Sequence, residues 1–177
     1  HGEGRGGTAD RRWYDPIMGP LWPAAVNKTL PEATMAEQLF QITNTVALLA
    51  WLPLLMLPGK RFITDTLCRR LVPAGLACCY VAVIGWKLAA GGPPPGDVMT
   101  IAGLRQAFSD DLVFAAAWTH YLVFDMVVGT VIAREAVAAG IPWPLRTLSL
   151  LLTFLSGPFG YLLHLSLRLR WPVTAAA

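Results

Sequence analysis

Four long apolar runs dominate the chain, and each is flanked by charged residues or by proline and glycine. They occupy residues 35–57, 71–90, 111–133 and 145–167. An α-helix rises about 1.5 Å per residue, so about 20 residues cross a hydrocarbon core that is about 30 Å thick. The pattern therefore predicts an all-α integral membrane protein, in which a bundle of four transmembrane helices forms one domain over residues 35–170.

The segments outside the four runs are short or rich in helix breakers. Residues 1–34 carry Pro16, Pro20 and Pro23 among glycines and aromatic residues, which predicts an extended N-terminal arm. Residues 97–110 place apolar side chains at helical spacing, which predicts a short amphipathic helix at the membrane surface. Residues 171–177 are left as a C-terminal tail.

Composition supports a membrane environment. Hydrophobic residues make up 55% of the chain and charged residues only 14%, whereas soluble domains carry about a quarter charged residues. The net charge of +3 is too small to indicate nucleic acid, so membrane lipids are the expected partners. Four crossings would put both termini on one side and divide the basic residues between the two sides, so the positive-inside rule assigns no orientation.

The cysteines and the first residue add little. Cys68, Cys78 and Cys79 form neither a disulfide framework nor a metal-binding spacing. The sequence begins at His1 and not at a methionine, which leaves open whether a transit peptide was removed.

Ionisable residues inside the third run are the strongest functional signal. Asp125 lies near its middle, and a charged group at that depth is costly enough to suggest a function. Trp118, Tyr121 and Gly129 share its helix face by their spacing, and this face is expected to point into the bundle. We therefore predict that Asp125 acts as an acid or base on a lipid-soluble substrate.

The histidines allow two interpretations. His120 lies about 140° around the helix from Asp125, and it could act in acid–base catalysis or as an axial ligand of chlorophyll magnesium. His164 is a second candidate axial ligand; like Asn44, it could also simply hydrogen-bond a neighbouring helix. No other metal site is expected. In a bundle of four crossings, His164 would lie towards the same membrane side as Gln38 and Lys87.

Two motifs in the third and fourth runs resemble a known family. The segments AWTHYLVFDMVVG at 117–129 and LLTFLSGPFGYLL at 151–163 resemble signatures of the abscisic-acid-deficient-four-like family, the neoxanthin-synthase relatives, and LFQITN at 39–44 resembles its opening. The resemblance covers residues 37–170. The proline-rich arm, the run Pro93 to Pro95 and Ser156 depart from the family pattern.

The resemblance implies a four-helix membrane protein of plastids or bacteria. In plants the family is tied to making neoxanthin from violaxanthin, an epoxide opening that yields an allene. Such an isomerisation needs an acid and a base, for which Asp125 and His120 are the candidates, and it needs no redox cofactor. A groove lined by Gly129, Gly157 and Gly160 could hold the carotenoid.

Two functions remain open at this point. The first is a carotenoid epoxide isomerase in a chloroplast membrane, thylakoid or envelope. The second is a non-catalytic subunit of a photosystem or light-harvesting supercomplex that binds chlorophyll and carotenoid. Under either function, the residues expected to contact the pigment are Asn44, Trp118, Tyr121, Gly129, Gly157, Gly160 and His164.

Overall fold

The computed structural model describes residues 22–91 and 98–172, with side chains from Thr34 onward. This part of the chain is helical and contains no strand, which confirms the all-α prediction. The elements in order are α2 (Trp22–Met56), the π-helix η2 (Phe62–Leu71), α3 (Val72–Ala89), α4 (Ile101–Ala107), α5 (Asp111–Ala138), α6 (Trp143–Ser156) and α7 (Pro158–Arg170).

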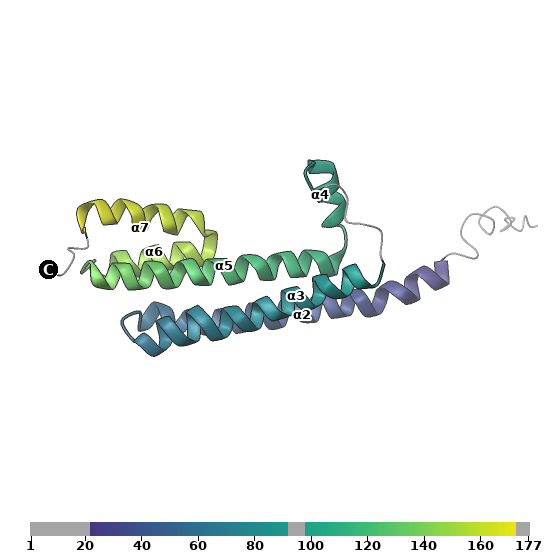
Figure 1. Cartoon of the computed structure of the whole chain (residues 1–177), viewed down its shortest axis with the longest axis horizontal. Coiled ribbons are helices and arrows are strands. Elements are labelled where there is room, and N and C mark those ends of the chain that lie inside the picture. Colours follow the sequence, from purple (N-terminus) through teal and green to yellow (C-terminus); the bar gives the residue numbers. More distant parts are fainter. Residues whose placement is uncertain (1–21, 92–97, 173–177) are drawn as a thin grey trace, which may run out of the picture.

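Three helical segments are long and apolar enough to cross a membrane. They are Thr34–Met56, Phe62–Ala89 and Asp111–Ala138. The helices α2 and α3 lie along α5, as Figure 1 shows, and many of their leucine, isoleucine and valine side chains are exposed. An outer surface of this kind suits contact with lipid. The chain is therefore a membrane protein, and the first three predicted spans correspond to long helices.

The fourth predicted span is wrong as a single helix. Gly157 has a φ of +42° and separates α6, of 14 residues, from α7, of 13 residues. Pro158 then begins a new helix, where its missing N–H costs nothing. The two helices fold back on each other, since a β-carbon on Gly160 would collide with Thr153 and Ser149 of α6. Each helix is only about 20 Å long, so the predicted four-helix bundle becomes three long helices and a helical hairpin.

The hairpin returns the chain to the end of α5 from which it left. Near the end of α7, Arg168 Nε lies 3.3 Å from a Glu135 carboxylate oxygen of α5, in an ion pair. The end of α7 and the start of α2 therefore lie at opposite ends of the molecule, and the expectation of both termini on one side is wrong. Arg168 of α7 lies with Arg69 of η2 at one end of the molecule, so basic side chains from both elements gather there.

The N-terminal boundary also differs from the prediction. Helix α2 begins at Trp22, inside the stretch 1–34 that was expected to be an extended arm. Pro23 falls in the first turn of this helix, where proline is tolerated. Residues 1–21, Pro93 to Pro95 and most of the tail lie outside the described residues. A short helix within the predicted stretch 97–110 is confirmed as α4, whose first turn is capped by the Thr100 hydroxyl.

Helix α5 is the centre of the packing. Its Met126 and Ile132 are fully buried with Trp51 and Leu54 of α2 and Leu150 of α6. Helix α5 therefore contacts every other long helical segment, and this packing fixes the positions of its residues.

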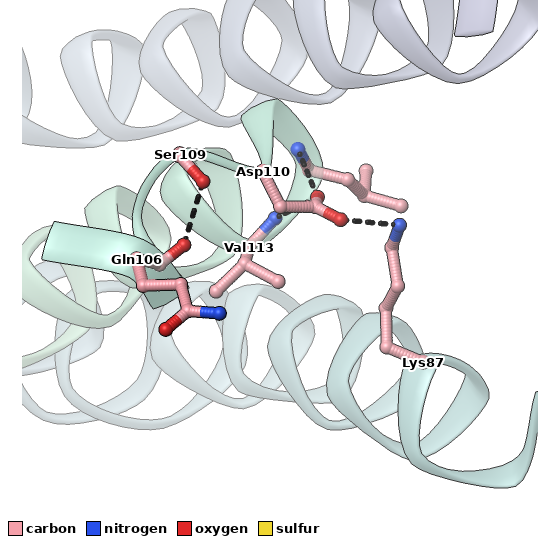
Figure 2. Close-up of polar contacts among 6 residues, drawn as sticks. Lys87, Gln106, Ser109, Asp110 and Val113 are labelled. Atoms are coloured by element: carbon pink, nitrogen blue, oxygen red, sulfur yellow. Dashed lines mark hydrogen bonds and ion pairs between the residues drawn. The ribbon is translucent and has the colours of Figure 1, made fainter. Parts of the chain in front are cut away.

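The start of α5 is fixed by one carboxylate, shown in Figure 2. Asp110 Oδ1 accepts hydrogen bonds from the N–H groups of Leu112 and Val113, and its Oδ2 lies 2.7 Å from Lys87 Nζ of α3. Burial raises the pKa of Asp110, but the Lys87 ammonium and the two N–H groups outweigh it, so the pKa lies below its ordinary value. Asp110 thus caps α5 and holds it to α3.

Candidate functional site

Asp125 lies at the middle of α5, roughly 20 Å from either end of the helix. Its half-buried carboxyl group touches the junction of the hairpin, because a β-carbon on Gly157 would lie only 2.7 Å from Asp125 Oδ1. The expectation that Asp125 faces the bundle interior is therefore met in part: its carboxyl group contacts the hairpin, but the side chain is only half-buried. Within the described residues no donor forms a hydrogen bond with this carboxyl group.

Helix dipoles give the carboxyl group little compensation. The C-terminal end of α6 and the N-terminal end of α7 both lie at Gly157. Their partial charges have opposite signs and largely cancel where the two ends meet. Among the described residues, no ion pair balances this carboxyl group at the centre of a membrane-spanning segment, and the two helix ends beside it contribute little net charge.

One face of α5 changes its surroundings at Asp125. The open face consists of Phe114, Trp118, Tyr121 and Asp125. The covered face continues the same helical line through Gly129, Ile132 and Ala136. The three aromatic side chains of the open face are 49%, 39% and 59% exposed, whereas the covered residues are buried against neighbouring helices, among them α2 over Gly129. In Figure 1, α4 rises beside one end of α5 and the hairpin of α6 and α7 lies along the other end.

Trp118 on the open face is held in place by α2. Its indole Nε1 donates to Asn44 Oδ1 at 3.0 Å, and its ring lies 5.8 Å from that of Phe40. The Asn44 amide nitrogen donates to the Phe40 carbonyl at 2.7 Å. Asn44 is therefore a positioning residue: both ends of its amide group are used to orient the tryptophan.

The glycines of the predicted groove serve mainly for close packing. The Trp51 ring of α2 occupies the space over Gly129, and it packs on Phe154 of α6 with ring centroids 5.4 Å apart. The predicted close contact at Gly129 is confirmed. Gly160 likewise lies directly on α6. Neither glycine leaves room for a ligand, which argues against the predicted groove at these two positions.

His120 lies apart from Asp125. Its ring packs 4.6 Å from Phe124 and 5.6 Å from Tyr80 of α3, on a different side of α5 from the hairpin. The structure therefore does not bring the two predicted catalytic residues together. The imidazole is exposed and remains accessible to a ligand from outside the helices.

His164 is placed differently from the expectation. It is buried in α7, and its Nε2 lies 3.2 Å from a Glu135 carboxylate oxygen. Because α7 runs back along α6, His164 lies at the opposite end of the molecule from Gln38 and Lys87. A buried imidazole paired with a carboxylate cannot reach a chlorophyll magnesium, so the structure argues against His164 as an axial ligand. In the described part of the chain, no three His, Cys, Asp or Glu side chains are grouped to hold a metal ion.

Sequence reasoning missed the junction of the hairpin as the neighbour of Asp125. It also missed the cluster of Glu135, His164 and Arg168 that ties α7 to α5. The pair Gly157-Pro158 was the available signal, because it combines a residue that permits positive φ with one that cannot continue a helix.

Comparison with known proteins gives one finding. A family model described as ABA DEFICIENT 4-like matches residues 38–164, well over half of the chain. No curated protein and no solved structure matches. The matched range includes α5, the hairpin junction and the open face.

Proposed function

The chain belongs to the ABA DEFICIENT 4-like family, and from this premise and the surroundings of Asp125 we propose that it binds an epoxy-xanthophyll on the open face of α5 and isomerises it. The observation that carries the proposal is the carboxyl group of Asp125, which is unpaired within the described residues and lies where the aromatic open face meets the hairpin. Unpaired ionisable groups inside a membrane usually mark a functional site. We place the protein in a chloroplast membrane, in keeping with the resemblance to neoxanthin-synthase relatives.

The open face has the chemistry of a site for a polyene. Trp118 and Tyr121 present flat apolar rings next to the carboxyl group, and sites for largely apolar ligands combine such rings with a few polar groups. From Asp125 to Phe114 the face extends about 17 Å along the helix. Beyond it lies α4, and the ring of Phe108, the residue after α4, packs edge-on against Phe114 with ring centroids 6.2 Å apart.

The depth of Asp125 constrains how the substrate binds. A xanthophyll that spans the bilayer keeps its polar end rings near the two surfaces, about 15 Å from the midplane. An epoxide on such a ring would not reach Asp125. The proposal therefore requires one end ring to be drawn to mid-depth beside Gly157, with the polyene following the open face towards α4.

The reaction needs two proton transfers and no net oxidation. A proton is added to the epoxide oxygen as its bond to one ring carbon breaks. A proton is removed from the adjacent carbon of the polyene, and its electron pair completes the allene. Because His120 lies on another side of α5, we assign both transfers to Asp125, with one carboxyl oxygen giving a proton and the other taking one.

The test uses the full chain purified in mild detergent and supplied with violaxanthin. Asp125→Asn keeps the shape of the side chain but cannot transfer the protons, so conversion measured by chromatography should fall at least 100-fold while the pigment is still bound. Asp111→Asn, on an exposed residue of the same helix, is the matched control and should convert normally. Equal conversion by wild type and Asp125→Asn would refute the catalytic role.

Pigment binding is tested separately. Tyr121 and Phe124 are exposed to nearly the same extent, 59% and 56%, but only Tyr121 belongs to the open face. Tyr121→Leu should weaken retention of violaxanthin, and Phe124→Leu should not. Equal retention by both variants would show that the open face is not the binding surface.

The exposed ring of His120 favours a second candidate function. An accessible imidazole between Tyr80 and Phe124 could ligate the magnesium of a chlorophyll held at the outer surface. That arrangement suits a non-catalytic subunit of a photosystem or light-harvesting complex. Under this function, chlorophyll should co-purify with the wild type and be lost in His120→Leu, whereas an isomerase should retain its activity in that variant.

A further inference from the structure

A basic cavity lies at the far end of α5, away from the open face. It has a volume of about 530 Å³, and it is lined by Arg69, Val131, Arg134, Glu135, Ala138 and Arg168. The three arginines come from three different elements, namely η2, α5 and α7. Val131 lies about 9 Å along the helix from Asp125, so this cavity is distinct from the proposed reaction site.

The acidic groups around the cavity are already paired. Glu135 faces both His164 at 3.2 Å and Arg168 at 3.3 Å. Asp65 of η2 lies 3.4 Å from Arg134. Among the described residues, no carboxylate pairs with Arg69. The cavity therefore keeps an excess of positive charge that is centred on Arg69.

We propose that this cavity binds the anionic phosphate headgroup of a membrane lipid. A guanidinium group offers several N–H donors that match the oxygens of a phosphate. Basic pockets between transmembrane helices, at the level of the membrane surface, are suited to anionic headgroups. The side chains of Val131 and Ala138 provide an apolar wall for the glycerol and the first part of the acyl chains.

The winding of η2 supports a binding role for this region. Residues Phe62–Leu71 form a π-helix, and the N–H of Val72 still donates to the carbonyl of Leu67 five residues earlier. Such winding is rare in proteins and is frequent at functional sites. It is anchored from inside, because the buried thiol of Cys68 donates to the Ala50 carbonyl of α2 at 3.3 Å. Arg69 is thus carried by a segment whose position is fixed.

The experiment measures lipid binding by the full chain in detergent with native mass spectrometry. Dioleoyl phosphatidylglycerol is the probe, and dioleoyl phosphatidylcholine is the lipid control. We compare Arg69→Gln with Arg70→Gln, since Arg70 is the exposed neighbour on the same helix and does not line the cavity. Phosphatidylglycerol should bind about five-fold more weakly to Arg69→Gln and with unchanged affinity to Arg70→Gln.

Three results would overturn the proposal. The first is binding of phosphatidylcholine as tight as that of phosphatidylglycerol, because it would remove any role for headgroup charge. The second is an equal loss of phosphatidylglycerol binding in both variants, which would show that binding depends on general surface charge and not on the cavity. The third is competition by inorganic phosphate at the same concentration as the lipid, because it would replace a lipid ligand by a soluble anion.

Discussion

The two halves of one face of α5 differ in the size of their side chains as much as in their surroundings. The open half carries Phe114, Trp118 and Tyr121, whereas the covered half carries Gly129, Ile132 and Ala136. Both halves are apolar, so hydropathy does not separate them. Close contact between helices in a membrane requires small or well-fitting side chains, and large aromatic rings do not permit the approach of the hairpin.

This difference separates stability from function along a single helix. Lipid is as apolar as the protein interior, so the covered half is stabilised by the fit of its side chains and gains little from leaving the solvent. Side chains of the open half contribute little to that fit. We therefore expect substitutions in the covered half, or in the hairpin itself, to lower stability, and substitutions in the open half to affect ligand binding.

The largest effect is expected at Gly160, where the hairpin is tightest. In Gly160→Ala the new methyl group would collide with backbone atoms of Ser149 and Thr153, which cannot rotate away. Such overpacking should lower the free energy of unfolding by about 3 kcal/mol. Thermal unfolding in detergent measures the change.

Gly85→Ala is the matched control for this substitution. Gly85 lies in α3 with nothing within 4 Å of its missing β-carbon, so alanine should be tolerated there or should stabilise the helix. Equal destabilisation by the two substitutions would contradict the packing of α7 on α6.

Much of the fold could be predicted from the sequence because run length is a direct physical signal. Three of the four apolar runs became long helices, and a short helix was found within the predicted stretch 97–110. The prediction for the fourth run was wrong because neither the length nor the hydropathy of a segment shows that the chain reverses direction within it. The reversal depends on two residues, Gly157 and Pro158, and on whether Gly160 allows the second helix to pack on the first.

The second prediction compares the two halves of α5 directly. Ile132→Ala opens a cavity in the covered half and should lower the free energy of unfolding by about 2 kcal/mol. This value is at the low end for such substitutions, because moving an apolar side chain from lipid into the protein interior gains little free energy. Tyr121→Ala in the open half should change stability by less than about 0.5 kcal/mol, as surface substitutions usually do. Thermal unfolding of both variants provides the measurement, and a larger loss at Tyr121 would refute the distinction.

The candidate site could be predicted only in part, since only some of its members lie on one helix. Periodicity placed Tyr121, Asp125 and Gly129 on a common face that was expected to point into the bundle. Gly129 and Asp125 do contact other helical segments, but Tyr121 is 59% exposed, so the expectation is wrong for the first half of this face. The neighbours from elsewhere in the chain depended on the direction of the fourth run. His164 was therefore assigned to the wrong end, and the role of Glu135 as its partner could not be foreseen.

The smallest expected effect lies at Asp110, which fixes the start of the open half. Its pKa is lowered by Lys87 and by the N–H groups that it caps. The pair therefore stabilises the protein above the unperturbed pKa of about 4 and loses this contribution as the pH falls through the lower pKa of the folded state.

Asp110→Asn keeps the cap and removes the ion pair, which is partly exposed, so it should cost about 0.5 kcal/mol at pH 7. In thermal unfolding, the difference from the wild type should shrink as the pH falls towards 3, while Asp111→Asn should show no comparable loss at pH 7. A difference at Asp110 that stays constant with pH would show that the ion pair does not stabilise this end of α5.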